Sequence, residues 1–380
     1  MILIVDDEAL NRKVIQWSLK DLGHEFVHAA NGQEAIDQVK AHENVALVVL
    51  DLMMPEMDGF AFLEWHREAP VEVREVPIVV NSALSDMDSI KRALKMGAYD
   101  YFTKPLSGDA LEVLLPTKVQ NAIQSAAAAR SLRLHAEEMH AELASAMRFQ
   151  TSMLPKAVDF APLGVEYVYR PCSLVGGDFF DLYRLGENVI GLIIGDVTGH
   201  GLKAGMMSLM VRSLFREFIA RDARPAVLIE ELNRALLGVF DVGHYITGVY
   251  GVFDIEAGTL RFANFGHPSP YLMKNGGAME SLEKRGHFLG ILDNVLIEET
   301  EIAFGEHERL VLYTDGVTET ANPDGEELTP EGFSKLVAAR GGDDPATWCR
   351  GVLGDIIGFH GSEEFNDDIL LVSCWTRKSS

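Results

Sequence analysis

A stretch of 38 residues without glycine or proline, residues 117–154, divides this chain of 380 residues into two parts of different character. Gly and Pro most often interrupt helices, and this stretch is rich in the helix formers Ala, Glu, Arg, Leu and Met. Its pattern predicts one long helix that can pair as a coiled coil, although a helix packed on its own domain would use the same residues. The apolar seam, with spacings of three and four broken only by polar Gln150, is Ala129, Leu132, Ala136, Met139, Leu143, Ala146 and Met153.

Before this helix, short apolar runs alternate with amphipathic segments. Runs of this length between helices indicate a parallel sheet that is buried on both faces. Pro116 then either kinks the last helix or lies in the first turn of a new one. The strands are predicted at 2–5, 24–28, 46–50, 77–81 and 99–103, and the helices at 9–22, 32–41, 59–69, 86–96 and 107–115.

Polar side chains stand at the ends of several of these apolar runs. In an open parallel sheet, ligands bind outside the carboxyl ends of the strands. We therefore expect these side chains to converge on one crevice. They are Asp6 and Asp7 after the first run, Asp51 after the third, Ser82 at the end of the fourth and Lys104 after the fifth.

After Pro155 the chain consists of short β-rich runs and a few amphipathic helices. Sheets built from such strands and covered by such helices would form an α/β sandwich. The strands are predicted at 165–170, 179–184, 189–196, 246–254, 258–264, 270–273, 309–314 and 369–375. The helices are predicted at 202–221 and 225–238, and near 330–340 and 345–358.

Four acidic motifs lie in this second part: GGDFFD at 176–181, GDVTGHG at 195–201, YTDG at 313–316 and NDD at 366–368. A single motif of this kind is usually a turn or a loop cap. Together they present carboxylates, which are hard oxygen ligands suited to Mg²⁺ or Mn²⁺, and two such ions can activate a bridging water and hold a phosphoryl group. The carboxylates in question belong to Asp178, Asp196, Asp315 and Asp367.

Composition excludes several classes of function. A net charge of −24 argues against nucleic-acid binding, because phosphate contacts need a basic patch. The acidic residues at 6–8 interrupt the first apolar run too early for a signal peptide, and no window approaches the roughly 20 apolar residues of a spanning helix. Cys172, Cys349 and Cys374 form no CxxC pair, so we expect a cytoplasmic protein without disulfides. From its charge and hydropathy we also expect that it binds neither nucleic acid nor membrane.

The first part of the chain resembles the receiver domain of two-component response regulators, which has a flavodoxin-like (βα)5 fold, and the domain is expected at 1–116. The resemblance implies one Mg²⁺ held by Asp6, Asp7 and Asp51, with Asp51 also accepting a phosphoryl group from a sensor histidine kinase or phosphotransfer protein. A flavodoxin-like domain with incidental carboxylates is the alternative. The residues that would sense the phosphoryl group are Ser82, Lys104 and Tyr101.

Residues from about 148 to 375 resemble the metal-dependent Ser/Thr phosphatases of the PPM type (type 2C), in particular the SpoIIE-like branch of partner-switching stress pathways. The expected domains are then a helical coiled-coil linker at 117–154 and an α/β-sandwich phosphatase domain at 155–380. Leu370 stands where this family usually has Thr, which should affect fit rather than metal binding. The two Mg²⁺ or Mn²⁺ ions would be held by Asp178, Asp196, the carbonyl of Val197, Asp315 and Asp367, and the four aspartates would be catalytic.

Together the two resemblances imply an enzyme in which phosphorylation of Asp51 controls a protein phosphatase. Its substrate would be phosphoserine or phosphothreonine on an anti-sigma-factor antagonist of the STAS type, and the linker helix would make a homodimer. The alternative is a non-catalytic adaptor that binds or sequesters a sigma-factor regulator, although loss of metal carboxylates would mark such a protein and all four are present. His200 and His267 are interpreted as structural residues.

Overall fold

The computed structural model describes residues 1–83, 87–104, 108–156, 160–199, 201–239, 243–274, 277–283 and 286–376. The chain divides into two compact units, Met1–Met139 and His140–Ser380. Helix α6 (Leu115–Ser152) contributes residues to both units. Within the described residues, no helix is both long and apolar enough to cross a membrane.

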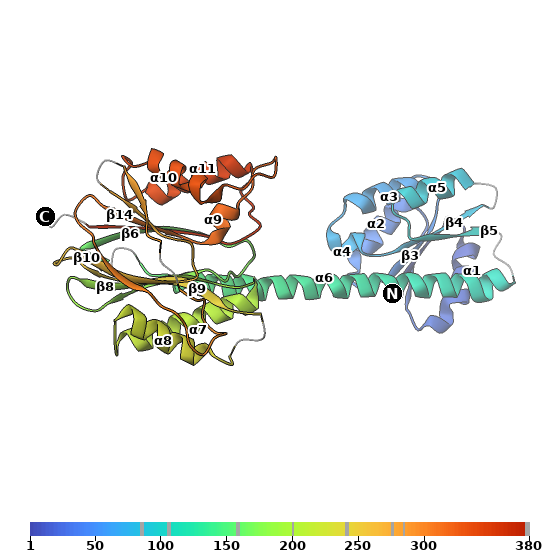
Figure 1. Ribbon diagram of the computed structural model, residues 1–380. Coiled ribbons are helices and arrows are strands. Elements are labelled where there is room, and N and C mark those ends of the chain that lie inside the picture. The colour runs from blue at the N-terminus through green and yellow to red at the C-terminus, as the bar shows by residue number, and fades with distance from the viewer. Residues whose placement is uncertain are drawn as a thin grey trace. The chain divides into compact units, whose positions relative to one another are not determined.

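The N-terminal unit is built on a parallel sheet with the strand order β2-β1-β3-β4-β5 (Figure 1). This arrangement confirms the predicted flavodoxin-like fold, and the strand positions agree with the prediction to within two residues. The elements are β1 (Ile2–Val5), α1 (Ala9–Leu19), η1 (Lys20–Leu22), β2 (Phe26–Ala29), α2 (Gly32–Ala41), β3 (Leu47–Asp51), α3 (Gly59–Glu68), α4 (Val71–Arg74), β4 (Ile78–Ala83), α5 (Met87–Lys95), β5 (Asp100–Lys104) and η2 (Ala110–Leu114).

Side chains alternate between the two faces of this sheet, as the twofold period of a strand requires. In β1, Leu3 and Val5 belong to the core on one face, while Ile2 and Ile4 belong to the core on the other. All four are fully buried. Both faces are therefore covered, which explains why the strands are continuous apolar runs.

Helix α6 begins inside the N-terminal unit. A π-helical segment, η2, runs directly into it, and Pro116, which has no N–H to donate to the preceding turn, lies where the π-helical turn ends. Leu115, Val119 and Ala122 are fully buried in the receiver core. Instead of a separate helix at 107–115 followed by a linker, one continuous helix completes the receiver and runs onward. The domain limits expected at 116 and 154 remain predictions.

The C-terminal unit contains two antiparallel sheets, in the orders β13-β10-β9-β8-β7 and β12-β11-β14-β15-β6. Its elements are β6 (Leu163–Arg170), β7 (Phe179–Arg184), β8 (Val189–Val197), α7 (Leu202–Ile219), α8 (Pro225–Leu236), β9 (Ile246–Asp254), β10 (Thr259–Phe265), β11 (Tyr271–Met273), β12 (Met279–Ser281), β13 (Glu299–Ala303), β14 (Arg309–Tyr313), α9 (Asp315–Glu319), α10 (Thr329–Ala339), α11 (Trp348–His360) and β15 (Ile369–Thr376).

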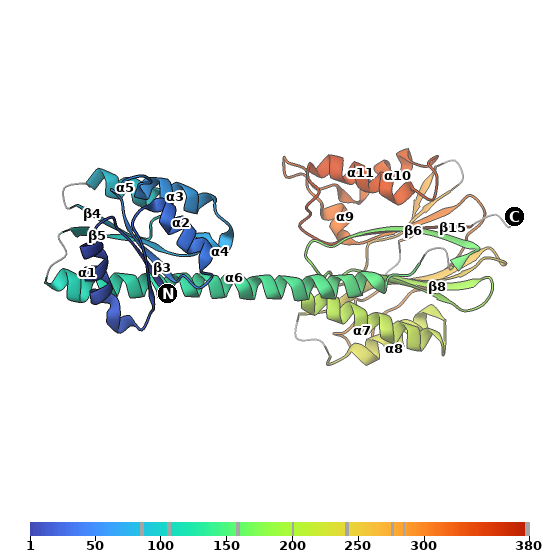
Figure 2. The ribbon, with the colours of Figure 1, turned by 180° about the vertical axis from the view of Figure 1, so that it is seen from behind.

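The two sheets are stacked, with α7 and α8 on one outer face and α9, α10 and α11 on the other (Figures 1 and 2). The core between them includes Phe180, Leu192, Val249, Leu312 and Leu370. This is the α/β sandwich predicted from the sequence. Helix–sheet packing on each side forms two further apolar clusters.

Three elements of this unit were not predicted: β12, β13 and α9. Strand β13 reads ETEIA and lies at a sheet edge, paired only with β10, so its side chains alternate between exposed and half-buried. An edge strand with charged residues lacks the apolar run that reveals a buried strand. Strand β12 is three residues long, and α9 is a single short helix after Tyr313.

Candidate metal site and receiver site

The four acidic motifs meet at one end of the stacked sheets. Asp178 immediately precedes β7, and Asp196 lies near the end of β8, which pairs antiparallel with β7. Asp315 follows the end of β14, and Asp367 lies two residues before β15, its antiparallel partner. Because antiparallel neighbours bring a strand start beside a strand end, motifs far apart in sequence become neighbours.

Two glycines allow the acidic loops to touch. A Cβ on Gly177 would lie 2.5 Å from the carbonyl oxygen of Val197 and 3.1 Å from Oδ1 of Asp196. A Cβ on Gly316 would lie 2.2 Å from the carbonyl oxygen of Asp368 and 3.3 Å from Cβ of Asp367. Only glycine permits approaches this close, so the glycines beside the acidic residues are part of the site.

The carboxylates of Asp178 and Asp196 interact with each other; Asp178 is buried and Asp196 is half-buried. Burial, together with the charges of Asp196 and Asp368, raises the pKa of Asp178 well above its ordinary value. Burial, together with the charges of Asp315, Asp367 and Asp368, raises the pKa of Asp196 to about 7. Two carboxylates held this close cannot both be ionised unless a cation lies between them; otherwise they share a proton.

This arrangement fits a pair of hard divalent cations. The donors are carboxylate oxygens and the Val197 carbonyl, and burial also raises the pKa of Asp315, as expected for a carboxyl group that awaits a counter-charge. Bound Mg²⁺ or Mn²⁺ would supply Lewis-acid activation of a phosphoryl group and of water. The ligand roles of the predicted residues remain predictions, but the structure brings them together.

Asp368 is a functional residue that sequence reasoning missed. Its carboxylate is buried and accepts hydrogen bonds from the backbone N–H of Cys172 (2.8 Å), Gly177 (2.7 Å) and Asp178 (3.4 Å). Its neighbour Asp367 is exposed. The two residues of the acidic pair thus differ in role: Asp368 holds the loop that carries Asp178, and Asp367 faces outward.

The thiol of Cys172 lies close to this pair, within a group of ligand atoms that are all within 4.8 Å of one another. Burial and the charge of Asp368 raise the pKa of Cys172 to about 12. A protonated thiol is a poor metal ligand. In the absence of a metal ion, this thiol is therefore protonated at neutral pH.

Thr314 connects the metal end to the last strand. Its hydroxyl donates to Oδ2 of Asp178 (2.7 Å) and accepts from the backbone N–H of Leu370 (3.1 Å). The side chain of Leu370 is fully buried in the core between the sheets. Leu370 thus contributes its backbone to this network, as expected for a core residue of a strand.

The NFGHPSPYL segment, residues 264–272, forms a hydrogen-bonded turn beside the site. The Asn264 side chain accepts from the backbone N–H of His267 and donates to its carbonyl oxygen, both at 2.8 Å. Nδ1 of His267 lies 2.9 Å from the hydroxyl of Thr247, which is paired with Asp196 between β8 and β9. Burial lowers the pKa of His267 to about 3, so it is neutral and structural. His200 lies outside the described residues.

The end of helix α6 contacts the same loop. Gln150, the polar break in the apolar seam, is 4% exposed. Its Nε2 donates to the carbonyl oxygen of Gly176 (2.8 Å) and to the hydroxyl of Ser208 in α7 (3.2 Å). In the sequence the residue looked like a defect in a coiled coil, whereas in the structure it joins α6, α7 and the GGD loop.

In the receiver unit, the predicted acidic residues converge as expected. One ligand atom from each of Asp6, Asp7 and Asp51 lies within 4.8 Å of the others. Nζ of Lys104 donates to Oδ2 of Asp51 (2.6 Å) and to Oδ2 of Asp6 (3.0 Å). Burial raises the pKa of Asp51, and the Lys104 ammonium opposes that rise. Three carboxylates with one lysine fit a single Mg²⁺.

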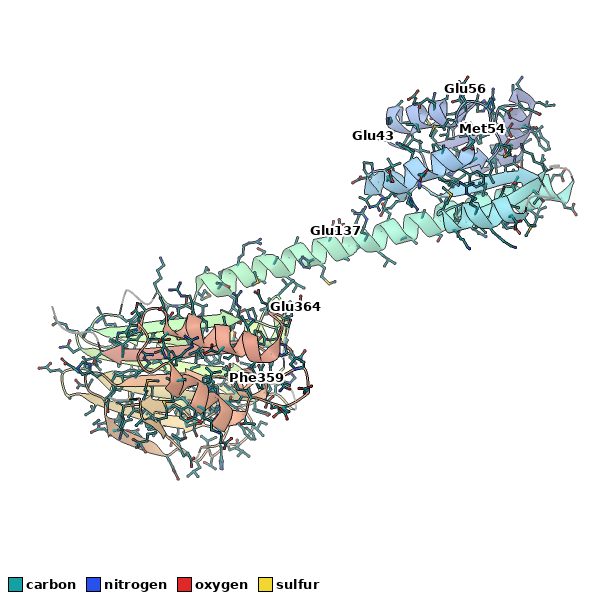
Figure 3. All side chains as sticks on the ribbon, turned by 90° about the horizontal axis from the view of Figure 1, so that it is seen from above. Glu43, Met54, Glu56, Glu137, Phe359 and Glu364 are labelled. Atoms are coloured by element: carbon teal, nitrogen blue, oxygen red, sulfur yellow. The ribbon has the colours of Figure 1, made fainter. Side chains whose placement is uncertain are left out.

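The other receiver residues lie on the neighbouring strands. Ser82 is buried on β4, and half-buried Tyr101 lies on β5. Nζ of Lys118, on α6, lies 5.3 Å from the centroid of the Tyr101 ring and 2.6 Å from Oδ2 of Asp100. Tyr101 is therefore in contact with α6. The loop after Asp51 carries Met54 and Glu56, both labelled in Figure 3.

Comparisons with known proteins agree with this architecture. The family model of Stage II sporulation protein E (SpoIIE) matches residues 186–376, just over half of the chain. The model of the response regulator receiver domain matches residues 2–115. The two matches lie on the two compact units.

Three relatives illustrate the likeness. Phosphoserine phosphatase RsbP of Bacillus subtilis is 28% identical over 180 residues, which are 46% of this chain and 45% of that protein. A probable transcriptional regulator, ycf27, of Porphyridium aerugineum is 40% identical over 111 residues, which are 29% of this chain and 44% of that protein. The SiaA-PP2C domain of Pseudomonas aeruginosa has a TM-score of 0.58 at 20% identity, covering 64% of this chain and 99% of that structure, and so shares the fold.

The chain matches less than half the length of these curated relatives. The family itself is nevertheless clear from the family models and from the fold. The chain belongs to the SpoIIE family, and it carries a response regulator receiver domain ahead of the phosphatase-type domain of that family.

Proposed function

We propose that the C-terminal unit is a Mg²⁺- or Mn²⁺-dependent protein serine/threonine phosphatase, and that phosphorylation of Asp51 controls it. The observation that supports this most is the interaction between the carboxylates of buried Asp178 and half-buried Asp196, whose pKa values are both raised by burial and by neighbouring carboxylates, as in a site that a cation would stabilise. Two ions would be held by Asp178, Asp196, the Val197 carbonyl, Asp315 and Asp367, and one Mg²⁺ by the receiver site.

In this mechanism the protein groups position the ions and the phosphate. Asp368 and Thr314 fix the loop of Asp178 by hydrogen bonds, so that its carboxylate needs no rearrangement during the reaction. The glycines at 177 and 316 leave room for oxygen donors to converge. Reaction would be direct hydrolysis, without a phosphoenzyme, and the ions would neutralise the charge of the phosphoryl oxygens.

The family supports a proposal for the substrate class. RsbP, a relative of this chain, is a phosphoserine phosphatase by name. We infer that this chain removes phosphate from a serine or threonine of a STAS-type anti-sigma-factor antagonist. Three free thiols, Cys172, Cys349 and Cys374, suit a reducing cytoplasm, where a sensor histidine kinase or phosphotransfer protein would phosphorylate Asp51.

Control would pass along α6. At its receiver end, Lys118 contacts Tyr101, and Arg133 makes two hydrogen bonds to Glu75 at 2.6 and 3.1 Å. Glu137, labelled in Figure 3, accepts a further hydrogen bond from Arg133. At the other end, Gln150 holds Gly176. One helix therefore contacts both the predicted sensing aromatic residue and the predicted metal loop.

The linker would also form a homodimer. Leu132 is 72% exposed and Met139 is 64% exposed, and both belong to the apolar seam. Replacing Leu132, Met139 and Leu143 with Glu should convert the dimer to a monomer in light scattering and remove the response to phosphorylation, while metal-dependent basal activity remains. A dimer that persists in this variant would show that association uses another surface.

An adaptor without catalysis is the alternative. Such a protein would not need a complete set of metal carboxylates, whereas here all four are brought to one end of the sheets.

The test is phosphate release from a phosphoserine protein by the full chain, before and after treatment with acetyl phosphate. Turnover should require Mg²⁺ or Mn²⁺, stop with excess EDTA and change on phosphorylation. Binding of the protein without any turnover would favour the adaptor, and turnover in EDTA would exclude the two-metal mechanism.

A further inference from the structure

A buried charge cluster lies between the end of α6, helix α7 and strand β7. Asp181 on β7 is fully buried, and Arg212 on α7 is 3% exposed. Arg216, one turn further along α7, forms a bidentate salt bridge with Asp181. Its Nε donates to Oδ2 at 2.6 Å and its Nη2 donates to Oδ1 at 2.8 Å. Asp181 belongs to the GGDFFD motif, yet it is not one of the predicted ligands.

Arg212 has a different set of contacts. Its Nη2 donates to the backbone carbonyl of Met153, just past the end of α6, and lies 3.5 Å from Oδ2 of Asp181. Its Nε is buried and has no hydrogen-bond partner among the described residues. Both oxygens of Asp181 already accept from Arg216. Arg212 thus combines a hydrogen bond to the Met153 carbonyl with a longer ion pair to Asp181.

A buried cation is costly when it loses an acceptor. If the end of α6 moved, Arg212 would either follow Met153, taking α7 with it, or turn to Asp181 and compete with Arg216. Either response displaces α7 relative to β7. Strand β7 begins directly after Asp178, so the displacement reaches the predicted metal loop.

We propose that Arg212 is a positioning residue: it couples the position of the last turn of α6 to the position of the loop that carries Asp178. This inference rests on the proposed phosphatase function and adds to it a second route, through α7 and β7. The Gln150 contact acts directly on the backbone of Gly176, whereas Arg212 acts through Asp181, which lies three residues after Asp178.

Arg216 provides a matched control. It pairs with the same Asp181 from the same helix. Its side chain is half exposed, and its Nε and Nη2 donate to Asp181 rather than to a group on α6. Arg212→Met leaves the Arg216–Asp181 pair complete, while Arg216→Met leaves Arg212 between Asp181 and Met153. Arg212→Met therefore removes the hydrogen bond to the Met153 carbonyl, and Arg216→Met does not.

The first measurement is hydrogen exchange in the full chain with Mn²⁺ bound. In Arg212→Met, amides at 150–153 and 176–181 should exchange about tenfold faster than in the wild type, because the tie that holds the end of α6 is gone. In Arg216→Met the amides at 150–153 should stay within about twofold of the wild type. Equal protection of these amides in the wild type and Arg212→Met would overturn the proposal.

The second measurement is Mn²⁺-dependent hydrolysis of p-nitrophenyl phosphate with and without beryllofluoride on the receiver. Arg212→Met should lose the response to beryllofluoride, whereas Arg216→Met should keep it. An Arg212→Met protein that responds like the wild type contradicts the proposal. Absence of turnover in the wild type would instead count against the proposed function, and hydrogen exchange would still decide the role of Arg212.

If Arg212→Met does not fold, as judged by a lost calorimetric transition, Arg212→Lys takes its place. Lysine keeps the positive charge but has a compact ammonium instead of the planar guanidinium. We therefore expect it to bind either the Asp181 carboxylate or the Met153 carbonyl, but not both. Faster exchange at 150–153 in this variant supports the proposal, and wild-type exchange there overturns it.

Discussion

The receiver site arranges its carboxylates around a lysine, whereas the charged groups that act most on Asp196 at the metal end, among the described residues, are carboxylates. In the receiver, Lys104 contacts both Asp6 and Asp51. At the metal end, the charges that act on Asp196 are those of Asp315, Asp367 and Asp368. In the receiver site, the Lys104 ammonium offsets part of the carboxylate repulsion even when no ligand is bound. At the metal end, bound divalent cations would be needed to offset that repulsion at neutral pH.

The pKa directions express this contrast. Burial raises the pKa of Asp51, but Lys104 opposes the rise. For Lys104 itself, burial would lower the pKa, yet the hydrogen bonds to Asp51 and Asp6 outweigh it and the pKa is raised. At the metal end, burial and neighbouring charges act in the same direction on Asp178 and Asp196. The comparison predicts three outcomes, in order of decreasing effect.

The largest effect is expected for Asp196→Asn. Loss of a central carboxylate should reduce metal-dependent turnover by about a thousandfold or more, since metal activation contributes several kcal/mol and each 1.36 kcal/mol is tenfold. Without metal, the variant should be at least as stable as the wild type, because a repulsive charge is removed. Phosphate release and calorimetry measure the two quantities. Asp51→Asn, which leaves the metal end intact, is the control, and undiminished turnover in Asp196→Asn would refute the metal role.

The second effect concerns the receiver. Asp51→Asn should abolish the single phosphoryl adduct that acetyl phosphate forms on the wild type, because the acceptor carboxylate is gone. Intact mass spectrometry detects the adduct, and EDTA-sensitive basal turnover should persist. An adduct that survives in the variant would place the acceptor elsewhere.

The smallest effect is a pH dependence of stability in the metal-free protein. The folded pKa of Asp196, about 7, lies above the ordinary value of 3.8, so its contribution to stability is complete below the ordinary value and is lost as pH rises through about 7. The melting temperature of the C-terminal unit should fall by several degrees between about pH 5 and pH 8. Added Mn²⁺ should restore it at pH 8.

Calorimetry of the full chain in EDTA, followed by addition of Mn²⁺, measures this dependence. Asp196→Asn should flatten it, and the receiver transition should change less, because Lys104 compensates Asp51. A C-terminal transition that is independent of pH in EDTA would mean that the carboxylates are already compensated, and the contrast between the two sites would fail.

Much of this architecture could be predicted from local patterns. The five receiver strands are apolar runs ended by polar residues, and parallel packing brings such ends together, so the convergence of Asp6, Asp51 and Lys104 followed from the order of elements. The glycine-flanked acidic motifs marked turns at strand ends. The long helix followed from the absence of Gly and Pro.

Tertiary structure alone decided how these parts are coupled. In the sequence, Gln150 interrupts the apolar pattern of the helix. In the structure, its buried side chain donates a hydrogen bond to the carbonyl oxygen of Gly176, a residue 26 positions away. Asp367 and Asp368 are equivalent in the sequence, but one is exposed and the other binds three backbone amides. Strand β13 was hidden because an edge strand needs no apolar run. Sequence periodicity reports which side of an element is buried, whereas pairing between buried polar groups depends on which elements the fold brings into contact.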